Sequence, residues 1–160
     1  MCDRAHRRGR LGLVTPRYTV TVKPLSIRFS DEIYDRLKQH ADRSGEPLST
    51  VAQQAVGEWL SMAEHPGVVF RGGPTGRRAA LAAGPDIWEV AAVVAQQSGS
   101  AEDRLTGAAE QLGLPVHQIE IAAAYWAAHR GEIDRRIAAN LDAADREAAA
   151  WEERQTLLGA

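Results

Sequence analysis

Hydrophobic and polar residues alternate in a short segment near the start of the chain. Over residues 24–29, three apolar side chains fall on one side of an extended backbone: Leu25, Ile27 and Phe29. Ser26 and Arg28 fall on the other side. A period of two predicts a β-strand with one apolar face. So short a strand is not stable alone, and the pattern therefore predicts pairing with the same strand of a second copy.

Helical periodicity follows this strand. Ser30 is a favoured N-cap residue, and Asp31 and Glu32 place negative charge in the first turn, where the helix dipole stabilises it. Gly45 predicts the end of this first helix. The apolar face of the helix consists of Ile33, Tyr34, Leu37 and Ala41.

A second helix is predicted to begin after Ser49, which we expect to be its N-cap. Its apolar face consists of Val51, Ala52, Ala55, Val56, Trp59 and Leu60. A helix start that faces outward offers free backbone amide groups to a DNA phosphate. Pro66 and Gly67 predict the end of this helix, because proline disfavours helix before it.

Residues 64–140 are predicted to form a second unit that opens with a β-hairpin. Residues 68–71 and 77–81 flank a glycine-rich tip at 72–76. The tip lacks the Lys-Ser/Thr ending that makes a phosphate loop specific, so nucleotide binding is not expected. Three hairpin residues are candidates for additional phosphate contacts, with a solvated surface patch as the alternative: Arg71, Arg77 and Arg78.

Three helices are predicted after the hairpin. Asp86 is expected to cap the first, and Ser100 with Asp103 forms a capping-box pattern at the start of the next. Gly113 then gives a helix-turn-helix spacing, because it allows a sharp turn between two packed helices. The helix from Val116 is nearly neutral and then apolar. This composition favours packing or dimer contact over DNA binding.

The last predicted element is one long amphipathic helix. Its apolar stripe consists of Ile133, Ile137, Leu141, Ala144, Ala148, Trp151 and Leu158. Acidic residues cover much of the remainder: Asp142, Asp145, Glu147, Glu152 and Glu153. Such a helix either folds back onto the preceding unit or lies in the groove of a partner. Trp151 is the candidate interface anchor.

The first unit resembles the ribbon-helix-helix family of bacterial repressors and antitoxins, over about forty residues. The resemblance rests on the alternation over 25–29, the capped helix start at 30–33, the turn glycine Gly45, and Ser49. It implies a dimer with exchanged strands, whose two-stranded ribbon enters the major groove of operator DNA.

By this resemblance Ser26 and Arg28 read bases, and Ser49 and Thr50 anchor the DNA backbone. Arginine can donate two hydrogen bonds to a guanine edge. The first outward strand position of the family is occupied here by Pro24, which offers no donor, so Lys23 is expected to assist. The alternative is a hairpin-plus-helices interaction module in which Arg28 is merely solvated.

Residues 65–137 resemble a second family, the domain of unknown function number 433, which is found in antitoxin-like proteins. The matching segments are 65–67, 76–78, 84–88, Gly113, 125–129 and 132–133. The resemblance implies a small helix-turn-helix-like fold and an association with toxins of the PIN-like ribonuclease class. It implies no active site.

Charge is distributed unevenly along a chain whose net charge is −2. Residues 1–28 contain seven basic residues and one acid, whereas residues 141–160 contain five acids and two arginines. This asymmetry favours DNA at one end and a basic protein partner at the other. The candidate residues for binding a toxin are Leu141, Asp142, Asp145, Trp151 and Glu152.

Residues 1–17 are predicted to be a disordered basic arm. The arm either contacts phosphates nonspecifically or results from an upstream start codon, with translation beginning near Val14. The single cysteine, Cys2, allows no internal disulfide, which suits the cytoplasm. No apolar run reaches the roughly 20 residues that span a bilayer, so no membrane association is expected.

Catalytic chemistry is not expected. The five histidines occur singly, and His129 with Glu132 gives only two ligands, too few for a metal site. No nucleophile with a partner base can be assigned. The sequence thus predicts neither an enzyme nor a cofactor or metal site.

The patterns together predict a mainly α fold with short β elements in four parts: the arm 1–17, a ribbon-helix-helix dimerisation domain 18–63, a helix-turn-helix-like domain 64–140 and an acidic helix 141–160. The predicted function is that of an antitoxin of a type II toxin-antitoxin system, which neutralises a ribonuclease toxin and represses its own operon. The alternative is a stand-alone dimeric regulator whose C-terminal domain dimerises or senses a ligand.

Overall fold

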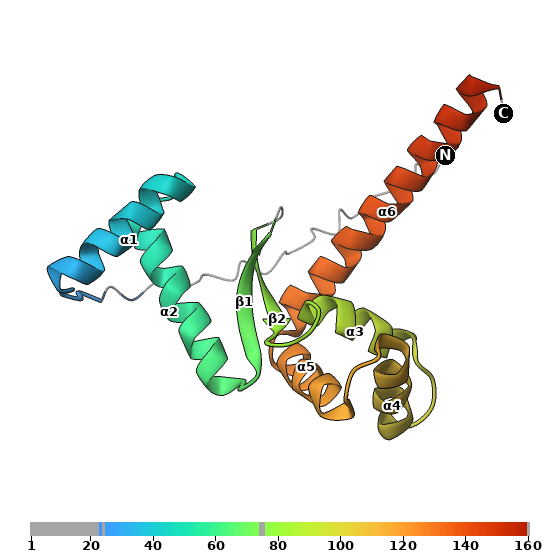
Figure 1. Cartoon of the computed structure of the whole chain (residues 1–160), viewed down its shortest axis with the longest axis horizontal. Helices are drawn as coiled ribbons and strands as arrows, with labels where there is room; N and C mark the ends of the chain where they lie inside the picture. The colour runs from blue at the N-terminus through green and yellow to red at the C-terminus, as the bar shows by residue number, and fades with distance from the viewer. Residues whose placement is uncertain (1–22, 24, 74–75, 160) are drawn as a thin grey trace, which may run out of the picture.

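The computed structural model describes residues 23, 25–73 and 76–159. In these residues the fold is mainly α-helical with one two-stranded sheet, as the sequence predicts (Figure 1). The predicted arm at 1–17 lies outside the described residues, as does Pro24.

The N-terminal unit is a pair of helices, α1 (Asp31–Ser44) and α2 (Leu48–Glu64). Ser30 occupies the N-cap position of α1, as predicted, although its side chain makes no capping hydrogen bond. Gly45 ends the helix at φ 71°, in the left-handed region that glycine adopts without steric cost.

The predicted start of α2 is wrong. Ser49 lies inside the first turn, and Pro47 is the N-cap residue. The carbonyl oxygen of Pro47 accepts hydrogen bonds from the backbone N–H groups of Thr50 and Val51, at 2.9 and 3.1 Å. Proline has a fixed φ and an extended ψ of 140° here, so it sets the chain direction without a side-chain cap.

Residues 25–30 form neither helix nor strand within the single chain. Their apolar side chains are exposed, with Leu25 at 80%, Ile27 at 53% and Phe29 at 40%. The sequence predicts a strand here only when the segment pairs with a second copy of the chain, so the strand stays a prediction.

The hairpin is confirmed. Strand β1 (Val68–Gly73) pairs antiparallel with β2 (Gly76–Leu81), in a register from Val68–Leu81 at the base to Gly73–Gly76 at the tip. The base of the hairpin is buried and carries apolar residues, whereas Gly72, Gly76 and Arg77 toward the other end are exposed. The hairpin therefore supplies one wall of a core.

Three helices contribute to this core: α3 (Ile87–Gln96), α4 (Ala101–Leu112) and α5 (Val116–Ala128). The predicted capping box is confirmed, since Ser100 Oγ accepts from the Asp103 N–H at 3.1 Å and Asp103 Oδ2 accepts from the Ser100 N–H at 2.9 Å. Gly113, at φ 65°, makes the predicted turn between α4 and α5. The largest fully buried side chains are Tyr125, Leu81, Ile87, Ile119, Ile133 and Val90.

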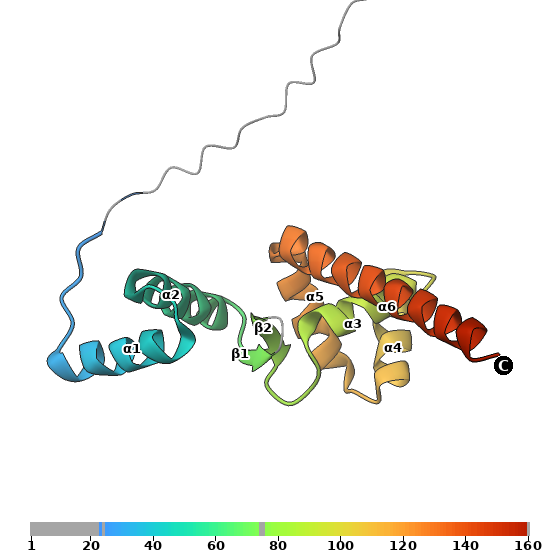
Figure 2. The same cartoon turned by 90° about the horizontal axis from the view of Figure 1, so that it is seen from above.

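The C-terminal helix α6 (Arg130–Leu158) is a single helix of 29 residues, as predicted, and is about 43 Å long at 1.5 Å per residue. Ile133 is buried in the core and Ile137 packs against it. The rest of the helix projects away from the body (Figures 1 and 2). It does not fold back, and the predicted boundary between residues 140 and 141 lies inside this helix.

Candidate DNA-binding and partner-binding surfaces

The N-terminal unit has an exposed apolar surface. Eight of the thirteen large apolar side chains that are exposed in the described part of the chain lie in residues 25–60. We call them the N-terminal apolar surface: Leu25, Ile27, Phe29, Ile33, Tyr34, Val56, Trp59 and Leu60. Only Ala41 and Val51 are buried among the described residues 23–64. The unit thus lacks a core of its own.

The predicted DNA-binding residues are all accessible. Lys23, Ser26 and Arg28 are exposed on the extended segment before α1. Ser49 and Thr50 are exposed in the first turn of α2, after α1. The two groups therefore lie beyond opposite ends of a 14-residue helix, and the single chain does not bring them together.

The three hairpin arginines make intramolecular hydrogen bonds. Arg71 donates to the carbonyl oxygens of Leu81, Gly84 and Ala82, at 2.5, 2.9 and 3.2 Å. Arg78 donates to the carboxylate of Asp86, which is buried and also accepts from the Trp88 indole N–H at 3.3 Å. These bonds hold the loop between β2 and α3, a structural role that the sequence pattern does not indicate.

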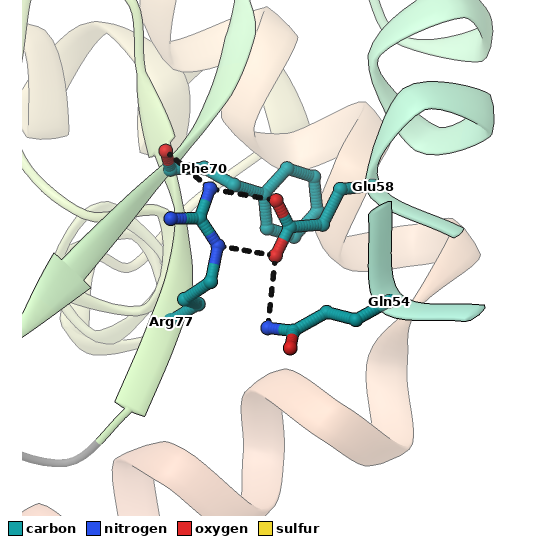
Figure 3. Close-up of polar contacts among 4 residues, drawn as sticks. All are labelled: Gln54, Glu58, Phe70 and Arg77. Atoms are coloured by element: carbon teal, nitrogen blue, oxygen red, sulfur yellow. Dashed lines mark hydrogen bonds and ion pairs between the residues drawn. The ribbon is translucent and has the colours of Figure 1, made fainter. Parts of the chain in front are cut away.

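Arg77 connects the hairpin to α2. Its Nε and Nη2 donate to the two carboxylate oxygens of Glu58 at 2.5 and 2.7 Å, and Nη2 also donates to the Phe70 carbonyl oxygen at 3.2 Å (Figure 3). Gln54 donates to Glu58 at 3.0 Å. The hydrogen bond with Glu58 raises the pKa of the Arg77 guanidinium above its ordinary value.

An aromatic cluster of the buried Tyr125 and two half-buried histidines lies where the end of α2 meets α5. The ring of Tyr125 stacks on His129 with ring centroids 4.2 Å apart, and His65 contacts both rings edge-on at 5.1 and 5.5 Å. Burial, followed by the negative charge of Glu132, raises the pKa of Tyr125 to about 12, while a hydrogen bond with Ser61 opposes the rise. The Tyr125 hydroxyl therefore stays neutral at physiological pH.

The sequence gives no sign of this cluster, because its members are up to 64 residues apart. Within the described residues, the buried Nε2 of His129 has no hydrogen-bond partner. No group of three or more His, Cys, Asp or Glu side chains in the same residues is placed to hold a metal ion.

The predicted partner-binding residues are brought together on the projecting part of α6. Leu141 and Trp151 are each 58% exposed, and Asp142, Asp145 and Glu152 are exposed as well. The Arg154 guanidinium lies 5.6 Å from the centroid of the Trp151 ring, a cation–π contact on the helix surface. This part of α6 thus combines exposed apolar and acidic groups.

No protein-family model matches the chain, and comparisons with curated proteins and with solved structures likewise find no match. Among the described helices, none has the length and apolar character needed to cross a membrane.

Proposed function

We propose that the protein is a homodimeric DNA-binding regulator of the ribbon-helix-helix type that also binds a protein partner through α6, and thereby acts as an antitoxin. The observation that carries the proposal is the N-terminal apolar surface on a unit whose described residues include only two that are buried. Complete burial of a large apolar side chain contributes about 1.5–3 kcal/mol. Eight such side chains, each 40–80% exposed, would together gain a part of this energy by association.

A second copy is the partner that this surface fits best. Its strand 24–29 supplies the edge that the same strand of the first copy requires, and both apolar strand faces then cover the helices. In this arrangement Ser26 and Arg28 project from the outer face of the ribbon toward the major groove. Lys23, Ser49 and Thr50 supply contacts to the DNA backbone.

The antitoxin part of the proposal is supported by α6. A single helix that projects with exposed apolar and acidic groups is suited to a protein with a basic groove. A ribonuclease fits this description, because RNA binding requires a basic surface. Occupation of that surface by Asp145 and Glu152 excludes RNA.

Dimerisation and DNA binding are tested with one pair of variants. Ile27→Asp places a charge in the centre of the proposed interface, and the control Leu157→Asp places the same charge at an exposed leucine near the end of α6. We expect light scattering to give a dimer for the wild type and the control and a monomer for Ile27→Asp. Only the two dimers should retard DNA from the region upstream of the gene. A dimeric Ile27→Asp protein contradicts the ribbon.

The antitoxin activity is tested by co-expression with the product of the adjacent reading frame, followed by purification through a tag on this chain alone. A stoichiometric partner whose ribonuclease activity is silent in the complex is the expected result. A bare homodimer that still retards its own upstream DNA supports a stand-alone regulator instead.

A further inference from the structure

The exposed part of α6 carries a regular seam of residues. Starting at Ile137, the spacings are four, three, four, three, four and three residues, through Leu141, Ala144, Ala148, Trp151, Gln155 and Leu158. This is the a/d pattern of a helix that packs against another helix. We call the six residues from Leu141 to Leu158 the α6 seam.

The seam continues the face that α6 buries in the core. Ile133 is 1% exposed and Ile137 packs against the same core. At 100° per residue, the seam points in nearly the same direction as these two side chains. The side chains of this face become exposed along the seam, with Leu141 at 58% and Leu158 at 80%. A packing face thus extends beyond the elements that it packs against.

The size of the side chains along the seam favours a helix as the occupant. Ala144 and Ala148 are small and lie between Leu141 and Trp151, so a second helix can approach closely at the centre and be held at both sides. Trp151, half exposed and projecting from a helix, is suited to be the anchor of such a contact.

The charges along the seam argue against a second copy of this chain. Asp145 and Glu152 follow one edge, whereas Glu147 and Arg154 follow the other. In a parallel pair of copies Glu147 faces Glu152, which is repulsive. In an antiparallel pair the repulsion between Asp145 and Glu152 is offset by attraction between Glu147 and Arg154, so a second copy gains no net charge attraction. A partner helix with lysine or arginine at its flanking positions meets these carboxylates with opposite charge.

We propose that the α6 seam binds a basic amphipathic helix of a different protein in coiled-coil packing. The inference deepens the proposed function and rests on it, because it specifies the element by which the protein partner binds. It makes the contact depend on both the apolar seam and its acidic edges.

The test uses the full-length protein and three labelled synthetic peptides of three heptads each. The first carries leucine at a and d and lysine at e and g; the second replaces lysine with glutamate, and the third replaces leucine with serine. Fluorescence anisotropy should show binding of the first peptide at least tenfold tighter than of the other two. If the serine peptide binds as tightly as the first peptide, charge attraction alone accounts for the binding, and the proposed packing on the seam is wrong.

Two sets of variants locate the contact. Leu141→Ala with Trp151→Ala should weaken binding of the basic peptide at least tenfold, whereas Leu157→Ala, on the side of α6 opposite the seam, should leave it unchanged. Glu147→Lys with Glu152→Lys should reverse the preference toward the glutamate peptide. Unchanged affinity in both double variants would overturn the proposal. Sedimentation gives a second test: if the mass of the protein falls when Leu141 and Trp151 are replaced, a second copy of the chain covers the seam, and the proposal is wrong.

The outcome is separable from that of the proposed function. If the wild-type chain co-purifies with a silenced ribonuclease but does not bind the basic peptide, the antitoxin function is supported and the proposed role of the seam is contradicted. If the chain binds the peptide through Trp151 but co-purifies with no partner, the proposed role of the seam is supported and the antitoxin function is contradicted.

Discussion

Arg77 on β2 donates two hydrogen bonds to Glu58 on α2, at 2.5 and 2.7 Å, and so joins the two-helix N-terminal unit to the hairpin of the second unit. The Glu58 side chain is only 13% exposed, whereas that of Arg77 is 38% exposed. The two units are therefore tied by a fork-to-fork ion pair that is partly shielded from water.

Glu58→Gln is expected to lower the free energy of unfolding by about 1 kcal/mol, because the charge-assisted bonds are lost while a neutral amide remains. Urea denaturation measures the change. The control is Asp134→Asn, which removes the exposed ion pair with Arg130 but leaves an amide oxygen that can still accept the hydrogen bond from the Trp126 indole N–H, and it should cost less than about 0.5 kcal/mol. A cost for Glu58→Gln no larger than for the control would show that solvent screens the Arg77 pair completely.

Gly113→Ala is expected to destabilise the protein by about 1–2 kcal/mol, because residue 113 has φ 65° and alanine is strained in that conformation. The space around an added Cβ is open, so the backbone accounts for the whole effect. Gly131→Ala, inside α6, should instead stabilise by about 0.5–1 kcal/mol. Thermal unfolding of the two variants gives opposite shifts, and a shift of the same sign would contradict the assigned backbone conformations.

Tyr125 makes stability fall at alkaline pH. The unfolded chain releases the tyrosine proton near pH 10, whereas burial raises the folded pKa to about 12. Between these values the unfolded state binds fewer protons, so the free energy of unfolding decreases as pH rises from 10 toward 12. Tyr125→Phe should flatten this decline in urea titrations at successive pH values, at the cost of the hydrogen bond with Ser61. An undiminished decline in Tyr125→Phe would contradict the assignment.

Arg28→Ala is expected to weaken binding to the upstream DNA by about 1–3 kcal/mol if Arg28 makes a two-bond contact with a guanine. Arg154→Ala removes the same charge from α6 and should change the affinity little. Gel retardation at fixed salt compares the two, because salt alone alters such affinities. Equal affinities of wild type and Arg28→Ala would count against the ribbon.

The features that the sequence predicts correctly have local causes. Gly45 and Gly113 end helices because they adopt positive φ, and Ser100 with Asp103 forms a cap within a single turn. The hairpin follows from apolar stretches that flank glycines, and α6 follows from its periodicity. Each of these signals lies within a few residues of the structure that it determines.

The features that escape prediction join residues that are distant in sequence. Glu58 and Arg77 are 19 residues apart, and His65 is 60 residues from Tyr125. No local pattern indicates that the hairpin arginines would find carboxylates and carbonyl groups within the chain. Serine is a favoured N-cap, which predicts a cap at Ser49, but Pro47 already fixes the chain direction two residues earlier.

Because α6 is one unbroken helix, the number of residues between two positions fixes the angle between their side chains about the helix axis. Because the same helix is anchored in the core by Ile133 and presents Trp151 far outside it, the azimuth of Trp151 is set by the number of intervening residues. One residue inserted in this span rotates everything beyond it by about 100°, whereas an insertion of seven restores the phase to within about 20° and displaces it outward by roughly 10 Å. The body of the protein thereby sets the direction in which a partner bound at the far end of α6 is held.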